Sequence, residues 1–209
     1  MLQEIAAYFE TNSASFLAAV WEHVAISAAS LLIALVTGVV GGGLCVLFGR
    51  LNTAVQAVFQ TLRIIPSLAV LLLLIPVMGT GMKPAVTALV LLAIPPILLH
   101  TVAGLSGVPD CMLETATGMG MTPGQAWRKV RFPLAMPVIL TGVKIASIEI
   151  VSSATLAAKI GAGGLGEIIF TGLGLYRTDL LLIGGLGVAL IALAAGCFFA
   201  VVDRVVFRY

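Results

Sequence analysis

The sequence predicts an all-α membrane protein, and three observations lead to that prediction. Hydrophobic residues make up 60% of the 209-residue chain and charged residues only 10%, whereas soluble domains carry about 25% charged residues. The mean hydropathy is +1.17. Several apolar runs reach the roughly 20 residues that a transmembrane helix needs. One membrane domain over residues 1–209 accounts for this length.

The apolar runs cover residues 24–48, 52–78, 85–107, 134–156 and 180–202. Five helices are predicted, because only helices and closed barrels satisfy backbone groups in lipid and runs this long do not alternate like strands. One set of span ends carries Arg50, Arg128, Lys129, Arg131, Arg204 and Arg208, and the other carries Lys83, Lys159 and Arg177. The positive-inside rule therefore predicts an N-terminus outside and a cytoplasmic C-terminus.

Several function classes fit the sequence poorly. A net charge of +2 without a basic run gives no indication of nucleic-acid binding. The chain lacks a GxxxxGK[ST] phosphate loop, and its three cysteines, Cys45, Cys111 and Cys197, have no metal-like spacing. An intramembrane enzyme is the alternative from another class, but His23, His100 and Glu149 form no recognised catalytic set. We expect no enzyme activity, metal or cofactor on this chain.

The connection between the third and fourth runs, residues 109–133, is too long for a simple turn. Its sequence predicts two short helices across the membrane surface. Pro109 begins the first helix, Gly118 and Gly120 allow a sharp turn, and Thr122 caps a second helix with Pro123 at its first position. Phe132-Pro133 is expected to end the second helix. Such a loop either docks into a partner protein or lies as an amphipathic helix among lipid headgroups.

This loop resembles the cytoplasmic signature of bacterial ABC importer permeases: EAA, three residues, Gly, nine residues, Ile, one residue, Leu-Pro. Glu114-Thr115-Ala116, Gly120, Val130 and Phe132-Pro133 stand at the matching positions, with Thr, Val and Phe as departures. The resemblance implies a five-helix type I permease bundle whose loop couples to an ATPase subunit. The coupling residues it implies are Glu114, Thr115, Ala116, Gly120, Trp127 and Pro133.

A second stretch, residues 152–174, contains G-x-G-x-x-G at Gly161, Gly163 and Gly166. A dinucleotide site would need a preceding strand, whereas a predicted transmembrane helix stands here. The sequence therefore favours a glycine-rich segment at the outer face. ATLAAKIGAGGLGEIIF at residues 154–170 and IPSLA at residues 65–69 resemble permeases of the osmoprotectant branch, which import glycine betaine, carnitine or choline. Methionine and other amino-acid importers are the nearest alternative.

Polar residues within the apolar runs are candidates for a translocation path, because charges in a membrane usually face the bundle interior or water. Glu149 suits a cationic solute, although it could instead form a structural ion pair with Lys144 or Arg63. The predicted path residues are Pro66, Ser67, Glu149, Ser152, Ser153 and Thr155. Pro66 with Ser67 marks either a pore-lining bend or a packing kink.

The resemblance also implies partners and a location. Two permeases, identical or paralogous, would enclose the path in the bacterial inner membrane, and two ATPases would hold the ATP and magnesium. Because the sequence ends at Tyr209, just after the last run, a separate extracytoplasmic binding protein is expected to deliver solute. An ATPase-independent carrier is a further alternative; it would not need a docking loop of this kind.

Overall fold

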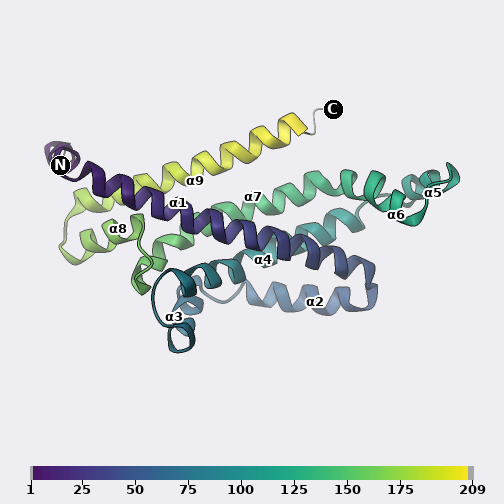
Figure 1. Cartoon of the computed structure of the whole chain (residues 1–209), viewed down its shortest axis with the longest axis horizontal. Helices are drawn as coiled ribbons and strands as arrows, with labels where there is room; N and C mark the ends of the chain where they lie inside the picture. Colours follow the sequence, from purple (N-terminus) through teal and green to yellow (C-terminus); the bar gives the residue numbers. More distant parts are fainter. Residues whose placement is uncertain (1, 207–209) are drawn as a thin grey trace.

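A computed structural model describes residues 2–206, and every regular element in that range is helical. The long helices α1 (Leu2–Leu47), α4 (Met82–Ser106), α7 (Phe132–Ala157) and α9 (Thr178–Val206) run side by side along the longest axis (Figure 1). The last three coincide with predicted apolar runs to within a few residues. The all-α prediction is confirmed.

The core lies where α1, α4 and α7 meet, and small residues bring these helices close together. A side chain at Gly42 would put its Cβ 2.7 Å from the Thr101 side chain, and one at Gly142 would lie 2.8 Å from the Pro96 carbonyl oxygen. Small residues at helix contacts are typical of membrane bundles, where close packing replaces the hydrophobic drive for association. By contrast α9 is poorly covered, and its Leu186, Leu190 and Leu193 side chains are exposed, as suits contact with lipid.

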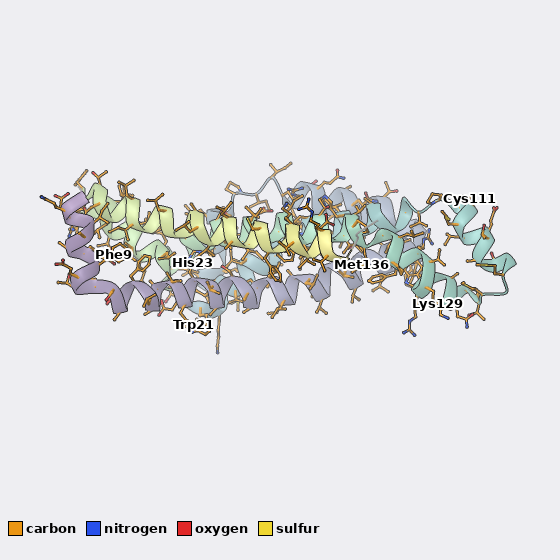
Figure 2. All side chains as sticks on the ribbon, turned by 90° about the horizontal axis from the view of Figure 1, so that it is seen from above. Phe9, Trp21, His23, Cys111, Lys129 and Met136 are labelled. Atoms are coloured by element: carbon orange, nitrogen blue, oxygen red, sulfur yellow. The ribbon has the colours of Figure 1, made fainter. Side chains whose placement is uncertain are left out.

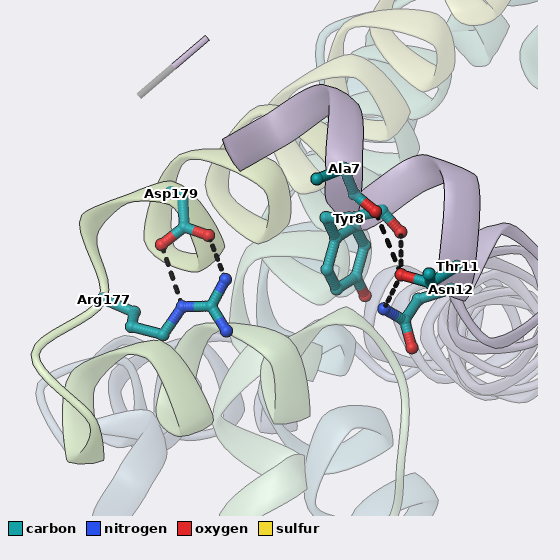
Figure 3. A network of polar contacts seen from close by, with 6 residues as sticks. All are labelled: Ala7, Tyr8, Thr11, Asn12, Arg177 and Asp179. Carbon is teal, nitrogen blue, oxygen red and sulfur yellow. Dashed lines mark hydrogen bonds and ion pairs between the residues drawn. The ribbon is translucent and has the colours of Figure 1, made fainter. Parts of the chain in front are cut away.

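The first helix is much longer than the run at residues 24–48 predicts, because α1 already begins at Leu2. A kink at Asn12, with φ −121° and ψ 16°, folds the first turns across the end of the bundle. Figure 3 shows this kinked leg beside the α8–α9 connection, where Arg177 Nε donates a hydrogen bond of 3.2 Å to Asp179. Hydropathy detects the length of an apolar run and not the helix itself, so the more polar first part of α1 was not predicted.

The predicted span at residues 52–78 is bent. The structure has two helices there, α2 (Gly49–Leu62) and α3 (Ser67–Met78), with a bend of 93° between them. Pro66, at φ −59° and ψ 135°, stands just before α3 and cannot donate to a continuing helical ladder. Among the described residues, four helices are thus long and apolar enough to span a membrane, or five if this bent pair counts as one span.

The short helices lie at opposite ends of the molecule. α5 (Asp110–Gly118) and α6 (Pro123–Ala126) project beyond one end, whereas α8 (Leu165–Gly174) and the N-terminal leg lie at the other (Figure 1). Figure 2 accordingly separates Phe9 from Cys111 and Lys129 by the length of the bundle. The α1–α2 connection lies at the end that carries α5 (Figure 1).

The predicted break at Phe132-Pro133 is absent from the structure. A π-helical turn, η1 (Trp127–Arg131), follows α6 directly and continues into α7. Its backbone bond runs from the Phe132 N–H to the Trp127 carbonyl oxygen. Pro133, the second residue of α7, cannot donate to the helical ladder, and the π-helical turn lies where that bond is missing. The α5–α6 loop is therefore joined to α7 by an unbroken helical segment.

Candidate functional site

The loop between α4 and α7 is built around a glycine turn. After α5, Gly120 adopts φ +83°, a conformation that disfavours residues with a Cβ. The Gly120 N–H bonds to the Thr117 carbonyl oxygen at 2.9 Å, and the Met121 N–H to that of Ala116 at 3.1 Å. These two bonds are the Schellman arrangement that closes the end of a helix. The turn thus depends only on residues within the loop.

The second arm of the loop begins with a capping box, as the sequence predicts. The Gln125 N–H bonds to the Thr122 hydroxyl at 3.4 Å, and the Thr122 N–H bonds to the Gln125 side-chain oxygen at 2.9 Å. Pro123 occupies the first helical position. Further on, Arg131 stacks on Trp127, 5.4 Å from the ring centre, and its Nε donates to the Leu105 carbonyl oxygen at 2.9 Å. Arg131 therefore ties this arm to α4.

An open groove of about 340 Å³ separates the two arms. Acidic side chains, Asp110 and Glu114, stand on one arm, and Trp127 with Arg131 on the other. The complete lining is Asp110, Leu113, Glu114, Thr117, Pro123, Ala126, Trp127 and Arg131. The lining thus carries two carboxylates and one guanidinium group.

The predicted coupling residues divide into a surface set and an internal one. Glu114, Thr115, Gly120 and Pro133 are exposed, and Trp127 is half-buried. Ala116 is only 1% exposed, so it packs inside the loop instead of presenting a surface to a partner.

The polar residues of α7 lie on two faces. Glu149 and Thr155 are half-buried and Ser152 is exposed, whereas Ser153 is buried on the packed side. Both exposed-face hydroxyls bond to their own helix: Ser152 Oγ to the Ile148 carbonyl oxygen at 2.9 Å and Thr155 Oγ1 to that of Ser152 at 2.6 Å. These bonds satisfy the hydroxyl donors but leave oxygen lone pairs available. Ser153 is thus separated from the rest of the predicted path set.

The bend between α2 and α3 lies near Glu149. The Arg63 guanidinium at the end of α2 is close enough to act on the Glu149 charge. Pro66 is exposed, and Ser67, the first residue of α3, is half-buried; α3 itself packs against α7. The bend and the acidic position of α7 therefore belong to one region.

The glycine-rich segment at the opposite end packs onto two residues that the sequence analysis did not select for it. Gly163 and Gly164 both adopt φ +83°, and the Gly164 N–H bonds to a Glu22 carboxylate oxygen at 3.0 Å. The neighbouring His23 is fully buried, with Nε2 3.0 Å from the Val151 carbonyl oxygen. Glu22 thereby caps the N-terminus of α8, where backbone N–H groups need acceptors. No short-range signal in the sequence marks this pairing.

Comparison with known sequences defines the class of protein. The sequence model of the family described as "Binding-protein-dependent transport system inner membrane component" matches residues 30–208. The chain belongs to this family of ABC importer permeases and is an integral membrane protein.

Similar curated proteins point within that family to one branch. The chain is 38% identical over 192 residues to the carnitine transport permease protein OpuCB of Listeria monocytogenes, covering 92% of this chain and 88% of the relative. It is also 38% identical over 207 residues to the choline transport system permease protein OpuBB of Bacillus subtilis, covering 97% and 94%.

A solved structure supports the same fold. The MetNI methionine ABC transporter, in an inward-facing conformation, matches with a TM-score of 0.79 and 27% identity, covering 91% of this chain and 95% of the matched chain. The type I importer fold implied by the resemblance is confirmed.

Proposed function

We propose that this chain is the permease subunit of an ATP-driven importer for quaternary ammonium osmoprotectants: glycine betaine, carnitine or choline. The observation that carries the proposal is the similarity over nearly the whole chain to permeases named for carnitine and choline. Glu149 on α7 is consistent with a cationic solute, because a negative charge offsets part of the cost of bringing the solute into the membrane.

The α5–α6 loop is the proposed docking site of an ABC ATPase, which binds ATP and magnesium and hydrolyses the ATP. Three features support this role: the loop projects beyond the bundle (Figure 1), its groove carries Asp110 and Glu114, and it continues through η1 into α7. Because the helix is unbroken, a displacement of the loop would move α7 and the polar residues on it. A movement of the partner on binding ATP would thus be passed through α7 to the polar residues of the proposed translocation path.

The remaining assembly follows from the family and from the arrangement of the ends. A second permease, a copy or a paralogue, would close the path against α3 and α7. The α5–α6 end would face the cytoplasm of a bacterial cell, and the glycine-rich end would face a separate solute-binding protein. The cationic residues Arg128, Lys129 and Arg131 at the α5–α6 end favour this orientation. Arg208, counted for the same side, lies outside the described residues.

The test is co-purification followed by uptake into liposomes. The chain is expressed with its neighbouring ATPase and binding-protein genes, pulled down, and reconstituted with ATP inside. We expect the ATPase to co-purify and labelled betaine, carnitine or choline to enter only with ATP. Uptake that continues without any ATPase would instead establish a secondary carrier.

Methionine is the second candidate solute, because the methionine transporter shares the fold at 27% identity. In the same assay, uptake of methionine and none of the three osmoprotectants would keep the importer class and reject the proposed solute.

A further inference from the structure

A lysine covers an aromatic ring just after α7, at the end of the molecule opposite the α5–α6 loop. Lys159 belongs to the short helix η2 (Ala158–Ile160) after α7, and its ammonium nitrogen lies 4.2 Å from the centre of the Phe170 ring in α8. The negative face of an aromatic ring attracts cations, and proteins recognise quaternary ammonium groups by this contact. The lysine therefore occupies the place that a trimethylammonium group can take.

The pair continues the exposed face of α7. Glu149, Ser152 and Leu156 follow at intervals of three and four residues, so they share one face of the helix. Lys159 comes three residues later, about 15 Å along the axis from Glu149 at 1.5 Å per residue. A solute moving along this face would meet Lys159 and Phe170 at the end opposite the α5–α6 loop, before it reaches Glu149.

The ring and the lysine differ in freedom. Phe170 is half-buried in α8, whose first turn is fixed by the bond from Gly164 to Glu22. At Gly166 a Cβ would overlap the Thr155 carbonyl, so α8 lies directly on α7. Lys159 is exposed, and its ammonium group stands at the end of a flexible side chain. A ligand can therefore displace the ammonium group while the ring stays in place.

We propose that Phe170 and Lys159 form an entry site that favours zwitterionic betaines over choline. The trimethylammonium group binds the Phe170 face, and the carboxylate pairs with the displaced Lys159 ammonium group. Choline has the same cation but a hydroxyl in place of the carboxylate, so Lys159 gives it no ion pair and repels its charge. Lys159 is thus a specificity-determining residue, and this role depends on the proposed solute class.

The test compares glycine betaine and choline uptake by the reconstituted complex with one binding protein throughout, so that the binding protein's own selectivity cancels between variants. We expect Lys159→Met to lower the betaine-to-choline ratio of kcat/KM about fivefold, the effect of one partly exposed ion pair. The change should be mainly in KM. Lys159→Arg keeps the charge and should keep the ratio.

Phe170→Leu should lower kcat/KM for both solutes about fivefold, because the aromatic ring is lost. Phe170→Tyr keeps a ring and should keep kcat/KM for both solutes near the wild-type values. The matched control is Lys83→Met, which removes another exposed lysine from the first turn of α4 and should leave the ratio unchanged. An unchanged ratio in Lys159→Met, or an equal loss for both solutes with kcat alone affected, overturns the entry site. If the wild-type complex imports neither solute, both the proposed function and the entry site are rejected. The wild-type measurement therefore distinguishes this outcome from a failure of the entry site alone.

Discussion

Two glycine turns, one at each end of the molecule, are held in different ways. Gly120 in the α5–α6 loop and Gly164 before α8 have the same φ of +83°. The Gly120 turn is closed by backbone bonds to residues a few positions earlier, and open space surrounds the glycine. The Gly164 turn is held by Glu22, 142 residues away, and lies against His23. The Gly120 turn is thus closed by its own neighbours, whereas the Gly164 turn depends on a residue of another helix.

This difference suits the two proposed roles. A loop with its own internal bonds keeps its shape while a partner pulls on it, and its motion passes into α7 through η1. The glycine-rich segment has no such independence, because its anchor is on α1. A rearrangement at that end must therefore involve α1, α7 and α8 together. Substitutions at the two turns should accordingly affect different properties.

The largest effect is expected for transport in Gly120→Val. A β-branched residue at this φ carries strain of about 2 kcal/mol, which the loop can relieve only by opening the turn and moving its second arm. Docking that is weaker by this amount lowers ATP-driven uptake at least about tenfold. The measurement is uptake per permease in liposomes, with the amount of protein in the membrane checked separately.

Gly118→Val is the matched control for this variant. Gly118 is exposed in the same loop, has open space around it and does not have a positive φ. It should retain most of the uptake. Equal losses in the two variants would show that surface contact, and not the conformation of the turn, determines coupling.

The next effect concerns the stability of the opposite end. Gly164→Ala combines a positive φ with crowding, because the new Cβ would lie 3.2 Å from His23 Nδ1. We expect the free energy of unfolding to fall by about 2 kcal/mol, measured as a lower Tm in detergent. Gly161→Ala has a similar φ of +74° but open space, so it should lose about 1 kcal/mol. The difference between the two variants isolates the contact with His23.

The two ends also differ in how well sequence predicts them. For the α5–α6 loop, Thr122, Pro123 and Gly120 specify a cap and a turn through bonds that span only a few residues, and all three have the predicted roles. At the other end, glycines predict a turn but not what it packs on, because Glu22 and His23 are far away in sequence. A single sequence predicts caps and turns that form between residues close in the chain, but it does not predict which distant residues pack together.

Errors in the helices have the same origin. Hydropathy gave one run over residues 52–78, although Pro66 already marked the bend; composition carries no information on an angle of 93°. It also missed the first turns of α1, where Glu4 and Glu10 lower the hydropathy without preventing a helix. The predicted path set groups Ser153 with Ser152, but adjacent positions on a helix point to different sides. The burial of Ser153 follows from that geometry.

The smallest predicted effects come from the two helix caps, and they distinguish the two ends most directly. Glu22→Ala and Thr122→Ala each remove one side-chain acceptor from a helix N-terminus, which costs about 1 kcal/mol. Because the Thr122 hydroxyl accepts its hydrogen bond from Gln125 in the same loop, its loss should speed amide hydrogen exchange within residues 110–131 alone. Glu22 joins α1 to α8, so its loss should speed exchange in both helices. Glu10→Ala, an exposed acidic residue on α1, is the control for charge. If Glu22→Ala affected α8 without α1, the cap would be a local contact, and the distinction between an independent loop and an integrated segment would be lost.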